Sequence, residues 1–84
     1  MPFARTIAAE MAARPTLVKL PALVRWRIRR GMAQRELGEV AGVSRVNIAR
    51  IEGGGETHPR TARLLAVALE CSIDNLMAQP PTEG

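Results

Sequence analysis

The sequence predicts an all-α domain of five short core helices with one further helix at its N-terminus. Hydrophobic residues make up 46% of the 84 residues, which is enough for a single small core. Only Phe3 and Trp26 are aromatic, so aliphatic side chains and methionine must form that core, a composition that favours packed helices over a sheet. Apolar residues also recur at helical spacing, in segments that end at glycine or proline.

An N-terminal arm, residues 1–19, precedes the folded domain. Phe3, Ile7 and Met11 recur every four residues and predict a helix that Pro15 terminates. We expect this helix to pack on the domain, and a contact with a partner protein is the alternative. The short β-branched stretch after the proline predicts an extended connector.

The first two core helices are predicted over residues 21–30 and 34–41. Proline is tolerated at the start of a helix, and Gly31 and Gly42 are suited to the left-handed residue that often follows a helix end. The side chains expected to face inward are Leu23, Trp26 and Arg27 in the first helix, and Leu37, Val40 and Ala41 in the second.

Three further helices are predicted over residues 44–52, 60–70 and 72–77. Ser44 is a good N-cap for the first of these, and three glycines follow it. Residues 78–84 include two prolines and predict a disordered tail. The side chains expected to face inward are Ile48, Ile51, Leu64, Leu65, Ala68 and Leu69.

The spacing of two helices points to a function. The helices over 34–41 and 44–52 are separated by only Gly42 and Val43. Gly38 lies within the first of them, where glycine costs about 1 kcal/mol relative to alanine, so we expect the second helix to approach closely there. A steep crossing would leave that second helix protruding, with its outer face able to enter a DNA major groove.

The charge is unevenly distributed along the chain. Twelve basic and eight acidic residues give a net charge of +4. Ten of the basic and four of the acidic residues lie between Lys19 and Arg63, so this segment carries +6 and the remainder −2. Such a basic block is typical of a domain that binds a polyanion, and a solvated arginine-rich surface is the alternative.

Groups that support catalysis or bind metals are scarce. His58 is the only histidine, Cys71 the only cysteine, and tyrosine is absent, so we expect no enzyme, no metal site and no cofactor. We interpret Cys71, Met32 and Met77 as packing residues. No segment reads as an export signal or a membrane span, which favours a cytoplasmic protein.

The residues of this region resemble the Xre/Cro family of helix-turn-helix DNA-binding domains, which includes lambda-type phage repressors. The resemblance covers residues 20–77 and implies a lambda-repressor-like five-helix bundle. Ala33 stands where the family usually has a capping serine or threonine. The similarity is carried by QRELG at 34–38, GVSR at 42–45, IARIE at 48–52, TARLLAVAL at 61–69, and by Leu23, Trp26, Arg27, Gly31, Ser72 and Leu76.

The resemblance implies that the helix over residues 44–52 reads bases. We expect Arg45 to bind guanine O6 and N7, and Val46 to contact a thymine methyl group. Asn47 is expected either to pair with adenine or to bind a phosphate. Arg50 is expected at the DNA backbone or at an outer base. The predicted base-reading set is Ser44, Arg45, Val46, Asn47 and Arg50.

Other family positions imply phosphate contacts and a structural pair. Gln34, at the N-terminus of its helix, is expected to bind a DNA phosphate, and Arg60, in the loop before the fourth helix, is a weaker candidate. Arg27 and Glu52 are expected to form a partly buried ion pair between the first and third helices.

The sequence thus predicts a sequence-specific transcriptional regulator, a repressor that binds palindromic double-stranded DNA as a homodimer. A single module makes few base contacts, so we expect two half-sites about one helical turn (~34 Å) apart. The dimer surface is expected either at the fifth helix, near exposed Leu76 and Met77, or at the N-terminal helix. The alternatives are an antitoxin that represses its own operon and binds a toxin, and a protein-interaction adaptor that does not read DNA.

Overall fold

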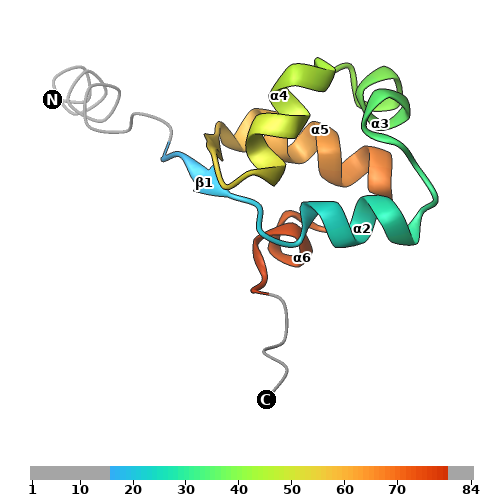
Figure 1. Ribbon diagram of the computed structural model, residues 1–84. Coiled ribbons are helices and arrows are strands. Elements are labelled where there is room, and N and C mark those ends of the chain that lie inside the picture. The colour runs from blue at the N-terminus through green and yellow to red at the C-terminus, as the bar shows by residue number, and fades with distance from the viewer. Residues whose placement is uncertain (1–15, 80–84) are drawn as a thin grey trace, which may run out of the picture.

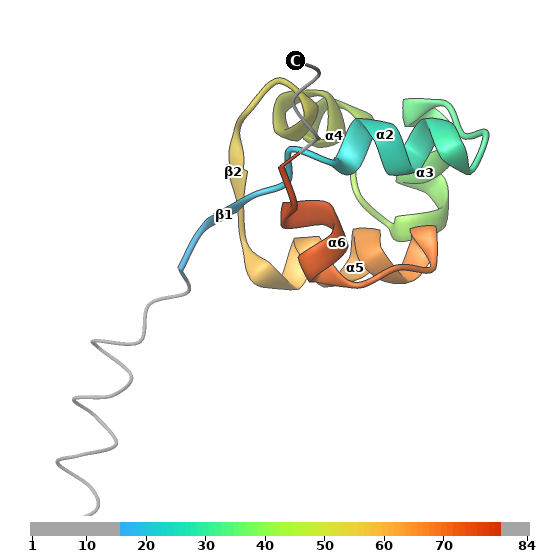
Figure 2. The same ribbon diagram turned by 90° about the horizontal axis from the view of Figure 1, so that it is seen from below.

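The computed structural model describes residues 16–79 and confirms the all-α prediction. Five helices pack around one core, and a short antiparallel sheet lies at one edge of the bundle (Figures 1 and 2). The predicted N-terminal helix and residues 80–84 of the predicted tail lie outside the described residues. The elements are β1 (Val18–Lys19), α2 (Leu23–Arg29), α3 (Gln34–Ala41), α4 (Arg45–Glu52), β2 (Glu56–Thr57), α5 (Pro59–Leu69) and α6 (Ile73–Met77).

The helix boundaries lie close to the predicted ones. α3 spans the predicted residues, and Gly42 follows it with φ 73°, the left-handed conformation expected of a terminating glycine. α5 begins one residue earlier than predicted, because the fixed φ of Pro59 suits the first position of a helix. Arg60 therefore lies in the first turn of α5 and not in the preceding loop, which corrects the prediction.

The core is aliphatic and draws on every helix. Trp26, Met32 and Cys71 pack against its edge. Leu76 is fully buried, so the prediction that it is exposed on a dimer surface is wrong, while its neighbour Met77 is 40% exposed. The largest fully buried side chains are Leu20, Leu23, Leu37, Ile48, Ile51, Leu65, Leu69 and Leu76.

Two apolar side chains predicted to face inward are exposed. Val40 is 61% exposed, because the buried face of α3 consists of Leu37, Gly38 and Ala41. Leu64 is 42% exposed, since α5 turns its small and branched residues at 62, 65, 66 and 69 towards the core. Helical spacing alone assigned these two residues to the wrong side of their helices.

The extended connector pairs with the segment after α4. β1 and β2 are antiparallel, with Val18 opposite Thr57 and Lys19 opposite Glu56 (Figure 2). The connector was predicted to be extended, but its pairing was not predicted. The sheet fastens the chain before α2 to the loop that follows α4, and so supports the far end of that helix.

Candidate nucleic-acid interface

The turn between α3 and α4 is fixed at two glycines. The Gly38 carbonyl oxygen accepts hydrogen bonds from the backbone N–H groups of Gly42 (2.9 Å) and Val43 (3.0 Å). A Cβ at Gly38 would lie 2.6 Å from the Val43 carbonyl oxygen and 3.5 Å from Ile48 Cδ1. A close approach at Gly38 is thus present, but it is made by the Val43 carbonyl oxygen of the turn and not by α4, whose nearest atoms would lie at an ordinary contact distance of 3.5 Å.

α4 lies at the periphery of the bundle (Figure 1). The Ser44 hydroxyl caps its first turn by accepting a hydrogen bond from the Asn47 backbone N–H at 3.1 Å. Ile48 and Ile51 anchor one face in the core. The opposite face is open to solvent: Ser44 and Arg45 are exposed, and Val46 is 79% exposed.

A bidentate ion pair joins α2 to the last residue of α4. Arg27 Nε donates to Glu52 Oε2 at 2.5 Å and Nη2 to Oε1 at 3.1 Å, while Nη1 donates to the Met32 carbonyl oxygen at 2.8 Å. The two charged side chains are only 13% and 9% exposed. Gln34 Nε2 also donates to Glu52 Oε1, at 2.9 Å, so one carboxylate connects α2, α3 and α4.

The protonation equilibria of this pair follow from these contacts. The hydrogen bond to Glu52 raises the pKa of Arg27. Burial alone would raise the pKa of Glu52, but hydrogen bonds from Arg27 and Gln34, together with the charge of Arg27, hold it below its usual range. Both groups are therefore charged at neutral pH.

The start of α3 borders a basic hollow. Its lining includes two predicted contact residues, Gln34 and Arg45, together with Arg35 and Ala33 from the start of α3 and Arg27 from α2. Ala33 has no side-chain acceptor, and its own N–H donates to Glu36 Oε1 at 3.0 Å. Since the first N–H groups of a helix have no intrahelical acceptor, this hollow offers amide donors as well as positive charge.

The remaining predicted contact residues lie elsewhere. Asn47 and Arg50 hydrogen-bond to each other on α4, and Arg60 lies in the first turn of α5, outside the hollow. Arg35 was not among the predicted contact residues, although its place beside Gln34 in the first turn of the same helix is visible in the sequence.

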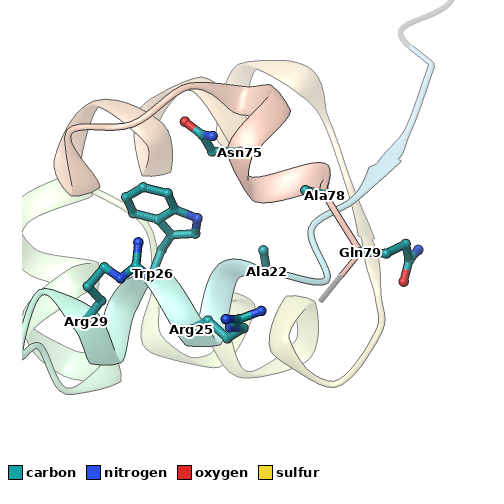
Figure 3. A pocket seen from close by; sticks show the side chains of 7 residues that line it. All are labelled: Ala22, Arg25, Trp26, Arg29, Asn75, Ala78 and Gln79. Atoms are coloured by element: carbon teal, nitrogen blue, oxygen red, sulfur yellow. The ribbon is translucent and has the colours of Figure 1, made fainter. Parts of the chain in front are cut away.

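A second pocket lies between α2 and α6 (Figure 3). Its walls include Trp26 and Arg29 from α2 and Asn75 from α6, and the Arg29 guanidinium carbon lies 5.1 Å from the centre of the Trp26 ring. None of the residues predicted to contact DNA lines this pocket. The basic hollow and this pocket share no lining residue, so they are separate regions of the surface.

Within residues 16–79, no group of three His, Cys, Asp or Glu side chains is placed to hold a metal ion. No helix in this part of the chain is both long and apolar enough to cross a bilayer. Cys71 is a half-buried free thiol whose pKa is raised by burial, an effect that the charge of Arg30 opposes.

Comparison with known proteins identifies the fold family. A family model described as helix-turn-helix matches residues 23–76, from the first residue of α2 to the fully buried Leu76 of α6. No curated protein and no solved structure matches the chain. The match covers more than half of the chain and includes both helices of the motif, α3 and α4. The chain belongs to the helix-turn-helix family of the Xre and lambda-repressor type, whose domains are DNA-binding and regulatory.

Proposed function

We propose that this protein is a sequence-specific transcriptional repressor that acts in the cytoplasm and inserts α4 into the major groove of a palindromic operator. The observation that carries the proposal is the exposed first turn of α4, on a helix whose other face is locked into the core. The major groove presents thymine methyl groups, which an exposed valine can contact, and base acceptors, to which an exposed arginine can donate.

In this proposal the first turn of α4 makes the base contacts. The Arg45 guanidinium is exposed, and its fork matches guanine O6 and N7, a contact that contributes about 1–3 kcal/mol of discrimination. Val46 contacts a thymine methyl group. The Ser44 hydroxyl accepts the capping bond from Asn47, and its own hydrogen remains able to donate to a base or a phosphate.

The hollow at the start of α3 binds a DNA phosphate in this proposal. The positive end of the α3 dipole, the amide donors and the Arg35 side chain favour an anion there. Gln34 has two side-chain N–H donors and gives one to Glu52, so the second can bind the phosphate. Arg60, exposed on α5, is a more peripheral phosphate contact.

We propose a homodimer on two half-sites about 34 Å apart, because one module of this size makes few base contacts. On α6, exposed Met77 is available for the dimer contact, whereas the buried Leu76 is not.

The proposal is tested by two measurements on the full chain. Binding to random-sequence duplex across a salt series should give a steep negative slope of log K against log salt, because phosphate contacts release counterions. In vitro selection from a randomised duplex library should then recover a palindrome. A nearly flat salt slope together with no enriched sequence would contradict DNA binding and favour a protein-interaction role.

A further inference from the structure

The last turn of α4 contains an arginine that uses three of its five N–H groups in hydrogen bonds within the chain. Arg50 Nε and Nη2 donate to Asn47 Oδ1 at 3.1 and 2.8 Å. Its remaining terminal nitrogen, Nη1, donates to the Glu56 carbonyl oxygen at 2.7 Å. The guanidinium therefore joins α4 to β2 in addition to holding a neighbouring side chain one turn away.

The loop after α4 fits closely around this guanidinium. The Gly55 backbone N–H donates to the Arg50 carbonyl oxygen at 2.9 Å. A Cβ at Gly55 would lie 2.6 Å from Arg50 Nη1 and 2.9 Å from the Arg50 carbonyl oxygen. Only glycine leaves room for this arrangement, and β2 is in turn paired with β1. Arg50 is thus held on both sides, in a place where it can position the Asn47 side chain.

This arrangement sets the orientation of the Asn47 amide. A guanidinium can only donate hydrogen bonds, so the atom that faces it must be the amide oxygen. Oδ1 accepts two hydrogen bonds and has no lone pair left for a further partner. Asn47 therefore offers two N–H donors and no acceptor to a ligand.

We propose that Asn47 reads a keto base, guanine or thymine, and rejects adenine and cytosine, because Arg50 fixes its amide. Asparagine recognises adenine by also accepting a hydrogen bond from the N6 amino group, and here the accepting atom is occupied. Guanine presents O6 and N7, and thymine presents O4, as acceptors for the amide. Adenine presents N7 as well, but its N6 amino group then faces the amide N–H groups with no acceptor. The inference rests on the proposed function. It replaces both ligands that the sequence suggested for Asn47, adenine and a phosphate, with a keto base.

In vitro selection with three forms of the full-length protein tests the inference. The wild type should prefer a keto base at one position in each half-site by about tenfold, the scale of one good base contact. Asn47→Ala should remove that preference. Asn47→Asp is the matched variant, because its carboxylate can still accept from Arg50 but has no donor for a base, so it should also lose the preference.

A fourth variant tests the positioning role. Arg50→Met keeps a long side chain but removes every donor, which frees Asn47 Oδ1 and allows the amide to turn. Adenine should then approach within about twofold of guanine at the same position, because the amide can again accept from its amino group. Preferences at all other positions should remain. A purely structural role for Arg50 would weaken binding to all sequences equally and leave that position unchanged.

The outcomes separate this inference from the proposed function. An adenine or cytosine preference at the position controlled by Asn47 would overturn the inference and leave the regulator in place. The same holds if Asn47→Ala weakens every sequence alike, since the amide would then bind a phosphate. If the wild type enriches no sequence and binds duplex without salt dependence, the proposed function fails, and the inference fails with it.

Discussion

The first and last turns of α4 differ in how they are held. In the first turn Arg45 and Val46 extend into solvent, and the only side chain bonded back to the backbone is the capping Ser44. In the last turn Glu52 is bound to α2 and α3, and Arg50 is bound to β2.

This difference shows how a short helix can present side chains with precision. Eight residues are too few for a stable isolated helix, so the orientation of α4 has to come from tertiary contacts. Those contacts are concentrated at the buried face and at the last turn, which leaves the first turn exposed. Breaking the ion pair of the last turn should therefore cost the most stability, whereas removing the exposed first-turn side chains Arg45 and Val46 should alter binding.

The largest expected effect comes from breaking the Arg27–Glu52 pair. Arg27→Met should lower the free energy of unfolding by about 3 kcal/mol, because it leaves a largely buried carboxylate without its partner. The double variant Arg27→Met/Glu52→Leu should be less destabilised than the single one. Urea denaturation followed by circular dichroism measures both.

The exposed Arg35–Glu39 pair is the control for that experiment. Its side chains are 84% and 69% exposed, so Glu39→Gln should leave the unfolding midpoint unchanged within error. A double variant less stable than Arg27→Met alone would contradict the account of the buried pair.

A smaller effect, of about tenfold, is expected on base preference. Arg45→Ala should remove the preference at one base pair in each half-site, because it removes a donor that reads a base edge. Gln34→Ala should weaken binding to all sequences alike, since a phosphate contact carries no sequence information. Competition binding with single-substituted operators distinguishes the two, and uniform weakening by both variants would refute the division of roles.

Acid should weaken the contacts that Glu52 makes from the last turn of α4. The pKa of Glu52 is lower in the folded than in the unfolded chain, so its contribution to stability is complete above its ordinary value of 4.5. That contribution is lost as the pH falls from there through the lowered folded pKa. Glu52→Gln should accordingly flatten the decline in unfolding free energy between about pH 5 and pH 2. An unchanged acid profile would show that other carboxylates dominate.

The smallest expected effect lies at the first turn. Ser44→Ala removes the side-chain acceptor of the Asn47 N–H and should lower the unfolding free energy by about 1 kcal/mol. Ser44→Asp preserves the acceptor and should restore most of that stability. Thermal melts of the three proteins provide the comparison, and equal melting temperatures would show that the cap contributes nothing.

The sequence predicted the features that depend on local chemistry. The end of α3 at Gly42, the Ser44 cap and the aliphatic core all follow from single residues or from helical spacing. Ala33 could be recognised as a missing cap, whereas the use of Glu36 to bind the Ala33 N–H emerged only from the structure.

Features that depend on distant segments were not predictable in the same way. Two-residue strands have no periodicity, so the β1–β2 pairing left no signal in the sequence. The engagement of Arg50 requires the Glu56 carbonyl oxygen, whose position is set by a loop of three glycines. The burial of Val40 and Leu76 was predicted wrongly, because an apolar residue near the edge of a helix face can be either buried or exposed.

Chemical substitution of one atom in the operator tests most directly whether the first turn of α4 enters the major groove. In the selected site, 7-deazaguanine replaces the guanine assigned to Arg45, which removes the N7 acceptor from the major groove and preserves base pairing. The wild type should lose affinity about tenfold, and Arg45→Ala should be indifferent to the substitution. Equal affinity of the wild type for both duplexes would contradict this mode of DNA recognition.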